Sequence, residues 1–277
     1  MRTRSRIEVI TGGTIVGVVV LLALLSLVWT PYNPIEVFPA ERLEGPSLSH
    51  LLGTDRYGRD VFSQIMAGSR ITLFVGLIAA GIGAIIGVPL GIVAGMQRGR
   101  GGRWIDQLIV RGADVLLAFP ALLMAIIAGA MVGTSTTSAM VAIGIASIPA
   151  FIRVTRAGTV RVMSQAYVEA ATLAGRSRWG VATRHVLPNL TGTIIVQASI
   201  TFALAILAEA ALSFLGLGTP PPEPSWGRML QSAQTLLGTD PLLAVWPGLA
   251  IALTVLGFNV LGDGLRDLLD PTGKDRA

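Results

Sequence analysis

The sequence has 277 residues, of which 52% are hydrophobic and 13% are charged, and its formal net charge is +5. Soluble domains carry about 25% charged residues, so this is not the composition of an ordinary soluble protein. The sequence contains no cysteine, which excludes disulfides, thiolate metal sites and cysteine nucleophiles. Long uncharged segments alternate with short charged clusters, which predicts a chain that crosses a lipid bilayer several times.

Six segments are apolar enough to cross the hydrocarbon core, which takes about 20 helical residues. The first follows a basic start and is longer than the apolar core of a signal peptide, so we expect a retained span. An uncharged stretch at 115–152 is too long for one crossing, and turn-favouring residues at 133–138 divide it. We therefore predict an all-α polytopic membrane protein with six transmembrane helices. The expected spans are 9–29, 71–97, 104–131, 139–157, 188–215 and 240–263.

Most basic residues lie on one side of the expected membrane. They occur at the amino end, in the loops after the second and fourth spans, and in the carboxyl tail. Cytoplasmic loops of membrane proteins are enriched in arginine and lysine. This distribution predicts a multi-pass protein of the bacterial inner membrane with both termini in the cytoplasm. Since topology explains the net charge, no nucleic-acid partner is expected.

The second span carries a glycine at every fourth position, so these glycines share one helix face. Small residues at this spacing let two helix backbones approach closely. The face can pack within the subunit or against a partner subunit, and the sequence leaves both alternatives open. The stripe comprises Gly83, Gly87, Gly91 and Gly95.

Charged residues are sparse inside the expected spans. Arg111 and Asp114 lie three positions apart on one face of the third span. We expect them to form an intramembrane ion pair with a structural role rather than a proton relay. Glu209 is expected near the outer end of the fifth span, within reach of water. A secondary transporter needs ion-coupling groups near the middle of the membrane, and the sequence offers few.

Two extracytoplasmic segments carry apolar residues at helical spacing. Residues 61–66 predict a short interfacial helix before the second span. After the proline-rich stretch 220–224, Ser225 is expected to cap a second short helix. These two elements cap the outer mouth, receive a partner or lie on the lipid surface, and the sequence does not decide among these alternatives.

The cytoplasmic loop between the fourth and fifth spans, residues 159–187, is the most informative segment. Ser164 is expected to cap a short helix, and Gly175 to end it in the left-handed conformation that glycine adopts at least cost. A stripe of small residues on this helix suits docking in a groove of another protein, and Glu169 adds one charge. An ordinary capped surface helix is the alternative. The stripe comprises Ala166, Ala170 and Ala174.

This loop resembles the EAA loop of bacterial ABC-importer permeases. The matching residues are Glu169-Ala170-Ala171, Gly175 and Leu187-Pro188. His185 stands where that pattern commonly has an aliphatic residue, but the Arg-His-x-Leu-Pro-Asn variant is usual in the dipeptide and oligopeptide branch. Three further segments are similar to that branch, and the one after the first span looks more like the C-type than the B-type subunit. These segments are 52–60, 224–230 and 262–271.

The resemblance implies a type I ABC-importer transmembrane-domain fold. The expected parts are a cytoplasmic N-terminus with the first span at 1–30, an extracytoplasmic segment at 31–68, a core permease domain at 69–268 and a cytoplasmic tail at 269–277. In that family the loop forms a coupling helix that docks on a cytoplasmic ATPase. The resemblance therefore implies that the matching residues of the loop are ATPase-coupling residues.

The resemblance also implies partners: a second homologous permease subunit, two cytoplasmic ABC ATPase subunits and an extracytoplasmic substrate-binding protein. The sequence itself has no phosphate-binding Gly-x-x-x-x-Gly-Lys-Ser/Thr loop and no catalytic constellation. No metal site is expected either, because His50 and His185 fall on opposite sides of the membrane. We therefore expect a non-catalytic subunit whose ATPase partners bind ATP and Mg.

The expected function is to form half of the translocation pathway of an ATP-driven importer of dipeptides or oligopeptides, working by alternating access. An importer of nickel or another small solute on the same scaffold is one alternative. A secondary transporter is the other, and it differs in needing no ATPase.

Overall fold

The computed structural model describes residues 2–97 and 103–269. This part of the chain is helical and contains no β-sheet, which confirms the all-α class. Arg98, Arg100 and the tail from residue 270 on, all expected in the cytoplasm, lie outside the described residues. The long helices are α1 (Arg2–Leu25), α2 (Val61–Gly95), α3 (Arg103–Ala118), α4 (Ala121–Val132), α5 (Thr136–Met163), α8 (Leu187–Phe214) and α10 (Leu242–Leu269). The shorter ones are α6 (Ala166–Leu173), α7 (Arg178–Val181) and α9 (Trp226–Ala233), with a π-helical turn at Ala182–Val186 and 3-10 turns at Pro39–Glu41 and Gln234–Leu236.

In the described part of the chain, five helical segments are long and apolar enough to cross a membrane, and the pair α3 and α4 makes a sixth if it counts as one span. The two helices of that pair are bent by 80° relative to each other. The expectation of one continuous helix at 104–131 is therefore wrong, because this segment forms two helices with a sharp bend between them. Pro120 explains the break, because it adopts an extended ψ of 133° and directly precedes α4, and proline disfavours the helical conformation in the residue before it.

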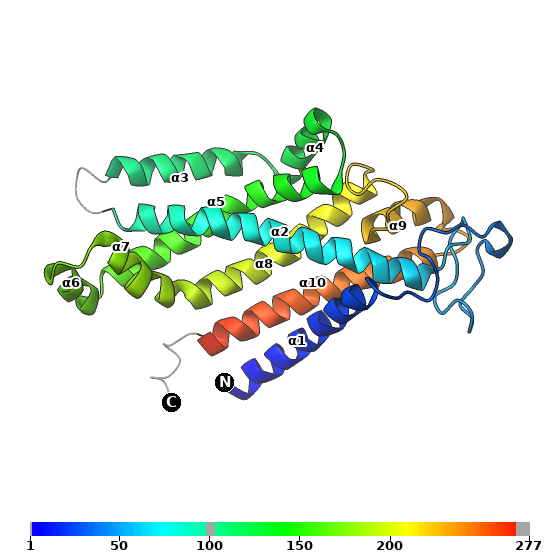
Figure 1. Ribbon diagram of the computed structural model, residues 1–277, viewed down its shortest axis with the longest axis horizontal. Coiled ribbons are helices and arrows are strands. Elements are labelled where there is room, and N and C mark those ends of the chain that lie inside the picture. The colour runs from blue at the N-terminus through cyan, green and yellow to red at the C-terminus, as the bar shows by residue number, and fades with distance from the viewer. Residues whose placement is uncertain (1, 98–102, 270–277) are drawn as a thin grey trace.

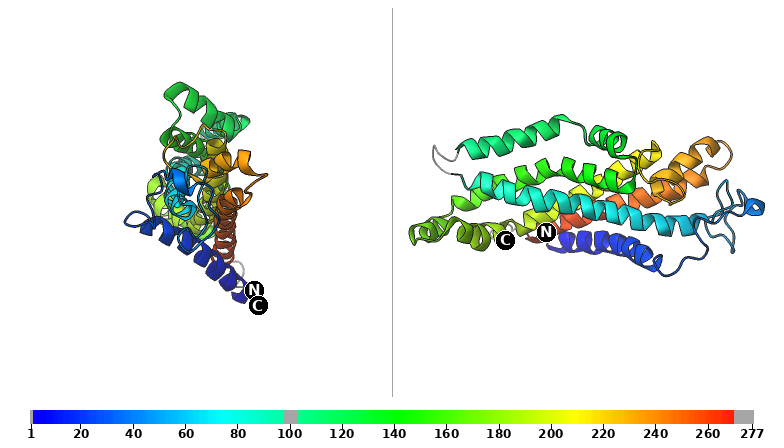
Figure 2. Two further views of the ribbon diagram at one scale, coloured as in Figure 1. Left: turned by 90° about the vertical axis from the view of Figure 1, so that its right-hand side faces the viewer. Right: turned by 45° about the horizontal axis from the view of Figure 1, so that its top comes forward.

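The long helices form an elongated bundle with α2, α5 and α8 at its centre (Figure 1). α1 packs along α10 on one side, and α3 and α4 lie on the opposite side next to α5, as the end-on view also shows (Figure 2). α6 and α7 project from one end of the bundle, whereas α9 and the segment before α2 cover the other end. α1 begins and α10 ends toward the end that carries α6 and α7.

The glycine stripe of α2 faces α5 of the same chain. A Cβ atom at Gly87 would lie 2.5 Å from the Cβ of Phe151 and 2.8 Å from the carbonyl oxygen of Ile148. Gly83, Gly91 and Gly95 approach side chains or backbone of α5 in the same way. Of the two alternatives that the sequence leaves open for this stripe, the structure shows packing within the subunit.

α2 begins at Val61, ten residues before the expected second span. The short interfacial helix expected at 61–66 is therefore wrong: these residues form the first turns of α2. Val61 and Ile65 are buried in one cluster with Trp226 of α9, whose indole nitrogen donates a 3.0 Å hydrogen bond to the carbonyl oxygen of Ile65. Packing against α9 thus continues the helix beyond the apolar span.

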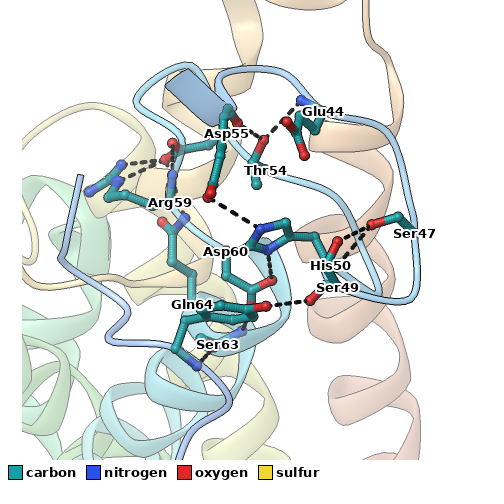
Figure 3. Close-up of polar contacts among 12 residues, drawn as sticks. Glu44, Ser47, Ser49, His50, Thr54, Asp55, Arg59, Asp60, Ser63 and Gln64 are labelled. Atoms are coloured by element: carbon teal, nitrogen blue, oxygen red, sulfur yellow. Dashed lines mark hydrogen bonds and ion pairs between the residues drawn. The ribbon is translucent and has the colours of Figure 1, made fainter. Parts of the chain in front are cut away.

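A polar cluster fixes the start of α2 (Figure 3). Asp60 is the N-cap: its carboxylate accepts a 2.7 Å hydrogen bond from the backbone N–H of Ser63 and lies 3.0 Å from Nδ1 of the buried His50. Asp55 accepts from the backbone N–H groups of Tyr57 and Arg59 at 2.8 and 3.0 Å. The segment 52–60, singled out by its sequence pattern, is thus a turn that holds the outer end of α2.

Glu209 is completely buried, which corrects the expectation that water reaches it. Its Oε1 atom accepts hydrogen bonds from the hydroxyl groups of Ser213, at 2.6 Å, and Thr219, at 3.3 Å. It therefore joins the outer end of α8 to the loop that follows. Ser225 is confirmed as the N-cap of α9, since its hydroxyl accepts from the backbone N–H of Arg228.

Candidate functional site

The candidate site is the projection formed by α6 and α7. Val168 anchors α6: it is fully buried, in one cluster with Val162 and Met163 of α5 and Val181 of α7. All other residues of α6 are exposed or half-buried. α6 is therefore held by one apolar contact and leaves most of its surface free.

The carboxyl end of α6 has the geometry expected from the sequence. Gly175 adopts a φ of +82°, which confirms its predicted left-handed conformation. The N–H of Gly175 donates to the carbonyl of Thr172 at 3.1 Å, and that of Arg176 donates to the carbonyl of Ala171 at 3.2 Å. These two bonds form a Schellman motif, which satisfies carbonyl groups that the helix end would leave unpaired.

The amino end of α6 differs from the expectation. Ser164 does not cap α6; it is the C-cap that follows α5, and its hydroxyl donates to the carbonyl of Arg161 at 2.8 Å. Gln165 precedes α6 and makes no side-chain capping bond. The reason is that α5 continues to Met163, six residues beyond the expected end of the fourth span.

The free surface of α6 and α7 combines small and large apolar side chains. Ala166, Ala170 and Ala174 are exposed as expected, beside the exposed Glu169. Leu173 and Trp179 are 84% and 78% exposed, and the sequence analysis singled out neither. Large apolar side chains gathered on an exposed surface indicate a site for another protein or a membrane. Because this projection extends away from the bundle, a second protein suits it better than lipid.

A second connection ties α6 to the start of α8. The amide nitrogen of Asn189 donates to the hydroxyl of Tyr167 at 3.2 Å and to the carbonyl of His185 at 2.7 Å. The Tyr167 and His185 rings lie 5.9 Å apart. The Arg-His-x-Leu-Pro-Asn pattern contains His185 and Asn189, but the sequence assigned no role to Tyr167.

Leu187 and Pro188 lie at the start of α8 and not on α6. The N–H of Leu187 donates to the carbonyl of Ala182, five residues earlier, in the π-helical turn. Proline lacks a backbone donor, so this wider turn lets the helix pass through Pro188 without a break. The structure therefore separates the matching residues: Glu169, Ala170, Ala171 and Gly175 on the projection, Leu187 and Pro188 at its base.

The expected ion pair between Arg111 and Asp114 is not formed. Asp114 pairs instead with Arg153 of α5 at 2.7 Å, and Arg156 pairs with Asp106 of α3 at 2.5 Å. An acid that follows the base in sequence is the less favourable order for a pair within one helix. The side of α3 that carries the two aspartates faces α5, where the two arginines lie.

Comparison with known proteins decides the family. The family of binding-protein-dependent transport system inner membrane components matches residues 87–274. The chain belongs to this family. The matched segment runs from the carboxyl-terminal part of α2 to residue 274 and includes α6, α7 and α8.

Relatives with known names support the assignment to this inner membrane component family. The chain is 44% identical over 260 residues to the glutathione transport system permease protein GsiD of Pectobacterium atrosepticum, covering 92% of this chain and 85% of the relative. It is 42% identical over 265 residues to the dipeptide transport system permease protein DppC of Alkalihalophilus pseudofirmus, covering 96% and 86%.

The fold is also that of a solved transporter. The MetNI methionine ABC transporter, in inward-facing conformations, matches with a TM-score of 0.64 and 15% identity, over 75% of this chain and 96% of that chain. This likeness concerns the fold alone, and it confirms the ABC-importer transmembrane-domain fold that the sequence resemblance implies.

Proposed function

We propose that this inner membrane component is a permease subunit of an ATP-driven importer of short peptides, and that it forms half of the translocation pathway. The observation that carries the proposal is the free surface of α6 and α7, with Leu173 and Trp179 exposed beside Glu169. The names of the relatives, a glutathione permease and a dipeptide permease, support peptides as cargo.

The proposed assembly contains a second homologous permease, two cytoplasmic ABC ATPase subunits and an extracytoplasmic substrate-binding protein. The ATPase subunits bind ATP and Mg, and this chain itself catalyses no reaction. Both termini and the α6–α7 projection lie in the cytoplasm, because the basic residues cluster at that end. Glu169, Ala170, Ala171 and Gly175 belong to the surface that meets the ATPase.

The connections of α6 suit it to transmit a movement. Val168 packs against α5, and Tyr167 is hydrogen-bonded to Asn189 of α8. A displacement of α6 by an ATPase therefore moves both helices together. In alternating access, ATP binding closes the ATPase pair, the two permeases rock as rigid bodies and the cavity opens outward; hydrolysis resets them. The driving force is that the ATPase binds one of the two states more tightly.

A pull-down in detergent tests the proposal. The tagged chain is expected to co-purify a second permease and an ATPase, and the complex is expected to drive ATP-dependent uptake of a labelled dipeptide in proteoliposomes. Glu169→Lys should lose the ATPase and keep the permease partner, whereas Asp240→Lys, at the other end of the bundle, should keep both. A chain that brings down no ATPase and transports alone would contradict the proposal. Uptake of nickel without peptide uptake would contradict only the cargo.

A further inference from the structure

The side of α3 that faces away from α5 carries a charge without a partner. Arg111 is exposed and forms no ion pair or hydrogen bond with any described residue. Leu108, three residues earlier, and Val115, four residues later, are 64% and 61% exposed and share its face. Within the described parts of the chain, no other helix covers this face.

The groove between α3 and α5 is charged as well. It has a volume of about 280 Å³ and is lined by Val110, Ala113 and Ile152 together with Asp114, Arg153 and Arg156. The side chains of Arg153 and Asp114 form an ion pair, and they are still 59% and 52% exposed. Asp114, which lines the groove, lies about one helical turn from Arg111, so the groove and the free face adjoin each other along α3.

These charges lie within segments that are expected to span the membrane, 139–157 and 104–131. Arg153 is ten residues from Met163, the last residue of α5, which is about 15 Å along the helix axis. Asp114 is eleven residues from Arg103, the first residue of α3, or about 16 Å. Neither group therefore lies at a helix end, and each belongs to a segment expected to cross the hydrocarbon core, which is about 30 Å thick. Exposing a charged side chain to lipid is costly, and such residues face water or another protein.

We propose that the free face of α3 and the α3–α5 groove line the aqueous translocation pathway, and that Arg111 binds the carboxylate of the peptide in transit. Asp114 and Asp106 already neutralise Arg153 and Arg156, so Arg111 is the guanidinium of this surface that remains free for a ligand. A guanidinium binds a carboxylate through two parallel hydrogen bonds, and every peptide with a free carboxyl terminus offers one. This inference rests on the proposed peptide cargo.

Cysteine accessibility tests the pathway part. The natural chain has no cysteine, so single substitutions need no altered background. In membranes that contain the assembled complex, Val115→Cys and Leu108→Cys are treated with a charged, membrane-impermeant thiosulfonate. Leu256→Cys, near the middle of α10 and 51% exposed, is the control for a position at membrane depth outside this surface. Thiosulfonates react with the thiolate, which forms where water stabilises its charge, so Val115→Cys should react at least about tenfold faster.

Substitutions at Arg111 test the ligand part. Uptake of a labelled dipeptide is measured in proteoliposomes at a saturating concentration of the loaded binding protein, together with the ATPase rate. Arg111→Gln should lower uptake about tenfold, the size of one lost charge-assisted hydrogen bond. Arg111→Lys should keep most of the uptake, and Arg111→Glu should fall below Arg111→Gln because it repels a carboxylate. The ATPase rate should stay within about twofold, and the exposed Arg266→Gln on α10 should behave as the wild type.

The outcomes separate this inference from the proposed function. Protection of Val115→Cys to the level of Leu256→Cys would overturn the pathway, because it would show that lipid or the partner permease covers the face. Equal uptake by the Lys, Gln and Glu variants would overturn the carboxylate site. A wild-type complex that takes up no peptide would refute the proposed cargo, and the carboxylate site with it, while the accessibility result would still decide the pathway.

Discussion

Asp114 of α3 pairs with Arg153 of α5 through a 2.7 Å hydrogen-bonded ion pair, although Arg111 lies one helical turn away on the same helix. The pair joins two helices separated by α4 and the break at Pro120. It acts together with the Arg156–Asp106 pair and the buried Ala113 to hold α3 against α5.

Breaking this pair should destabilise the protein. Asp114→Ala leaves the Arg153 guanidinium without its partner; because both side chains are more than half exposed, we expect a loss of about 0.2–1 kcal/mol, measured as a lower midpoint of thermal unfolding in detergent. The exchange Asp114→Arg with Arg153→Asp restores the pair and should recover part of the loss. No recovery, or an unchanged midpoint for Asp114→Ala, would show that the pair does not hold α3.

Glycine-to-alanine substitutions at two positions of α2 should change the stability of the protein in opposite directions. Gly87→Ala places a Cβ 2.8 Å from the carbonyl oxygen of Ile148, so α2 and α5 must move apart at a cost of about 1–3 kcal/mol. A Cβ at Gly81 meets nothing within 4 Å. Gly81→Ala should therefore be neutral or stabilise α2 by up to about 1 kcal/mol. Equal thermal midpoints for the two variants would contradict the close packing.

Gly175 should matter through its backbone alone. Its φ of +82° is unfavourable for a β-branched residue, at a cost of about 1–3 kcal/mol, while a Cβ there would meet no atom within 4 Å. We expect Gly175→Val to assemble with the second permease but to lose ATP-driven uptake, because the end of α6 is remodelled. Gly175→Asn should retain most uptake, since asparagine tolerates the left-handed conformation. Normal transport by Gly175→Val would refute the role of this turn.

The outer end of α2 depends on Asp60. Asp60→Ala removes the hydrogen bond to the N–H of Ser63 and the contact with His50. Loss of the cap alone costs about 0.5–2 kcal/mol, so the thermal midpoint should fall. Asp60→Asn keeps an oxygen for the cap and should fall less. If both variants fell equally, the carboxylate charge and not the cap would be the important feature.

His185 is predicted to be dispensable for stability. Its Nε2 atom is buried and has no hydrogen-bond partner among the described residues, and an unsatisfied buried polar group costs about 1–3 kcal/mol. His185→Leu removes this group and keeps the carbonyl that accepts from Asn189. The thermal midpoint should stay unchanged or rise. A clear fall would show that the imidazole makes a stabilising contact, such as its tilted ring contact with Tyr167.

Several features followed from the sequence because they are properties of a short stretch of chain. The length and apolar character of the spans determine which segments are helices long enough for a membrane. The left-handed Gly175 and the cap at Ser225 depend on a few neighbouring residues, so local propensity decides them. The family motifs could be read in the same way, as patterns of adjacent residues.

Other features depended on which helix faces come together. The sequence placed Arg111 and Asp114 on one face but could not show that Arg153, 39 residues further on, lies closer to Asp114. It placed Glu209 near the membrane surface but not under the loop that buries it. Nor could it choose a partner for the glycine stripe. Burial and side-chain pairing arise between segments distant in sequence, so only the tertiary structure decides them.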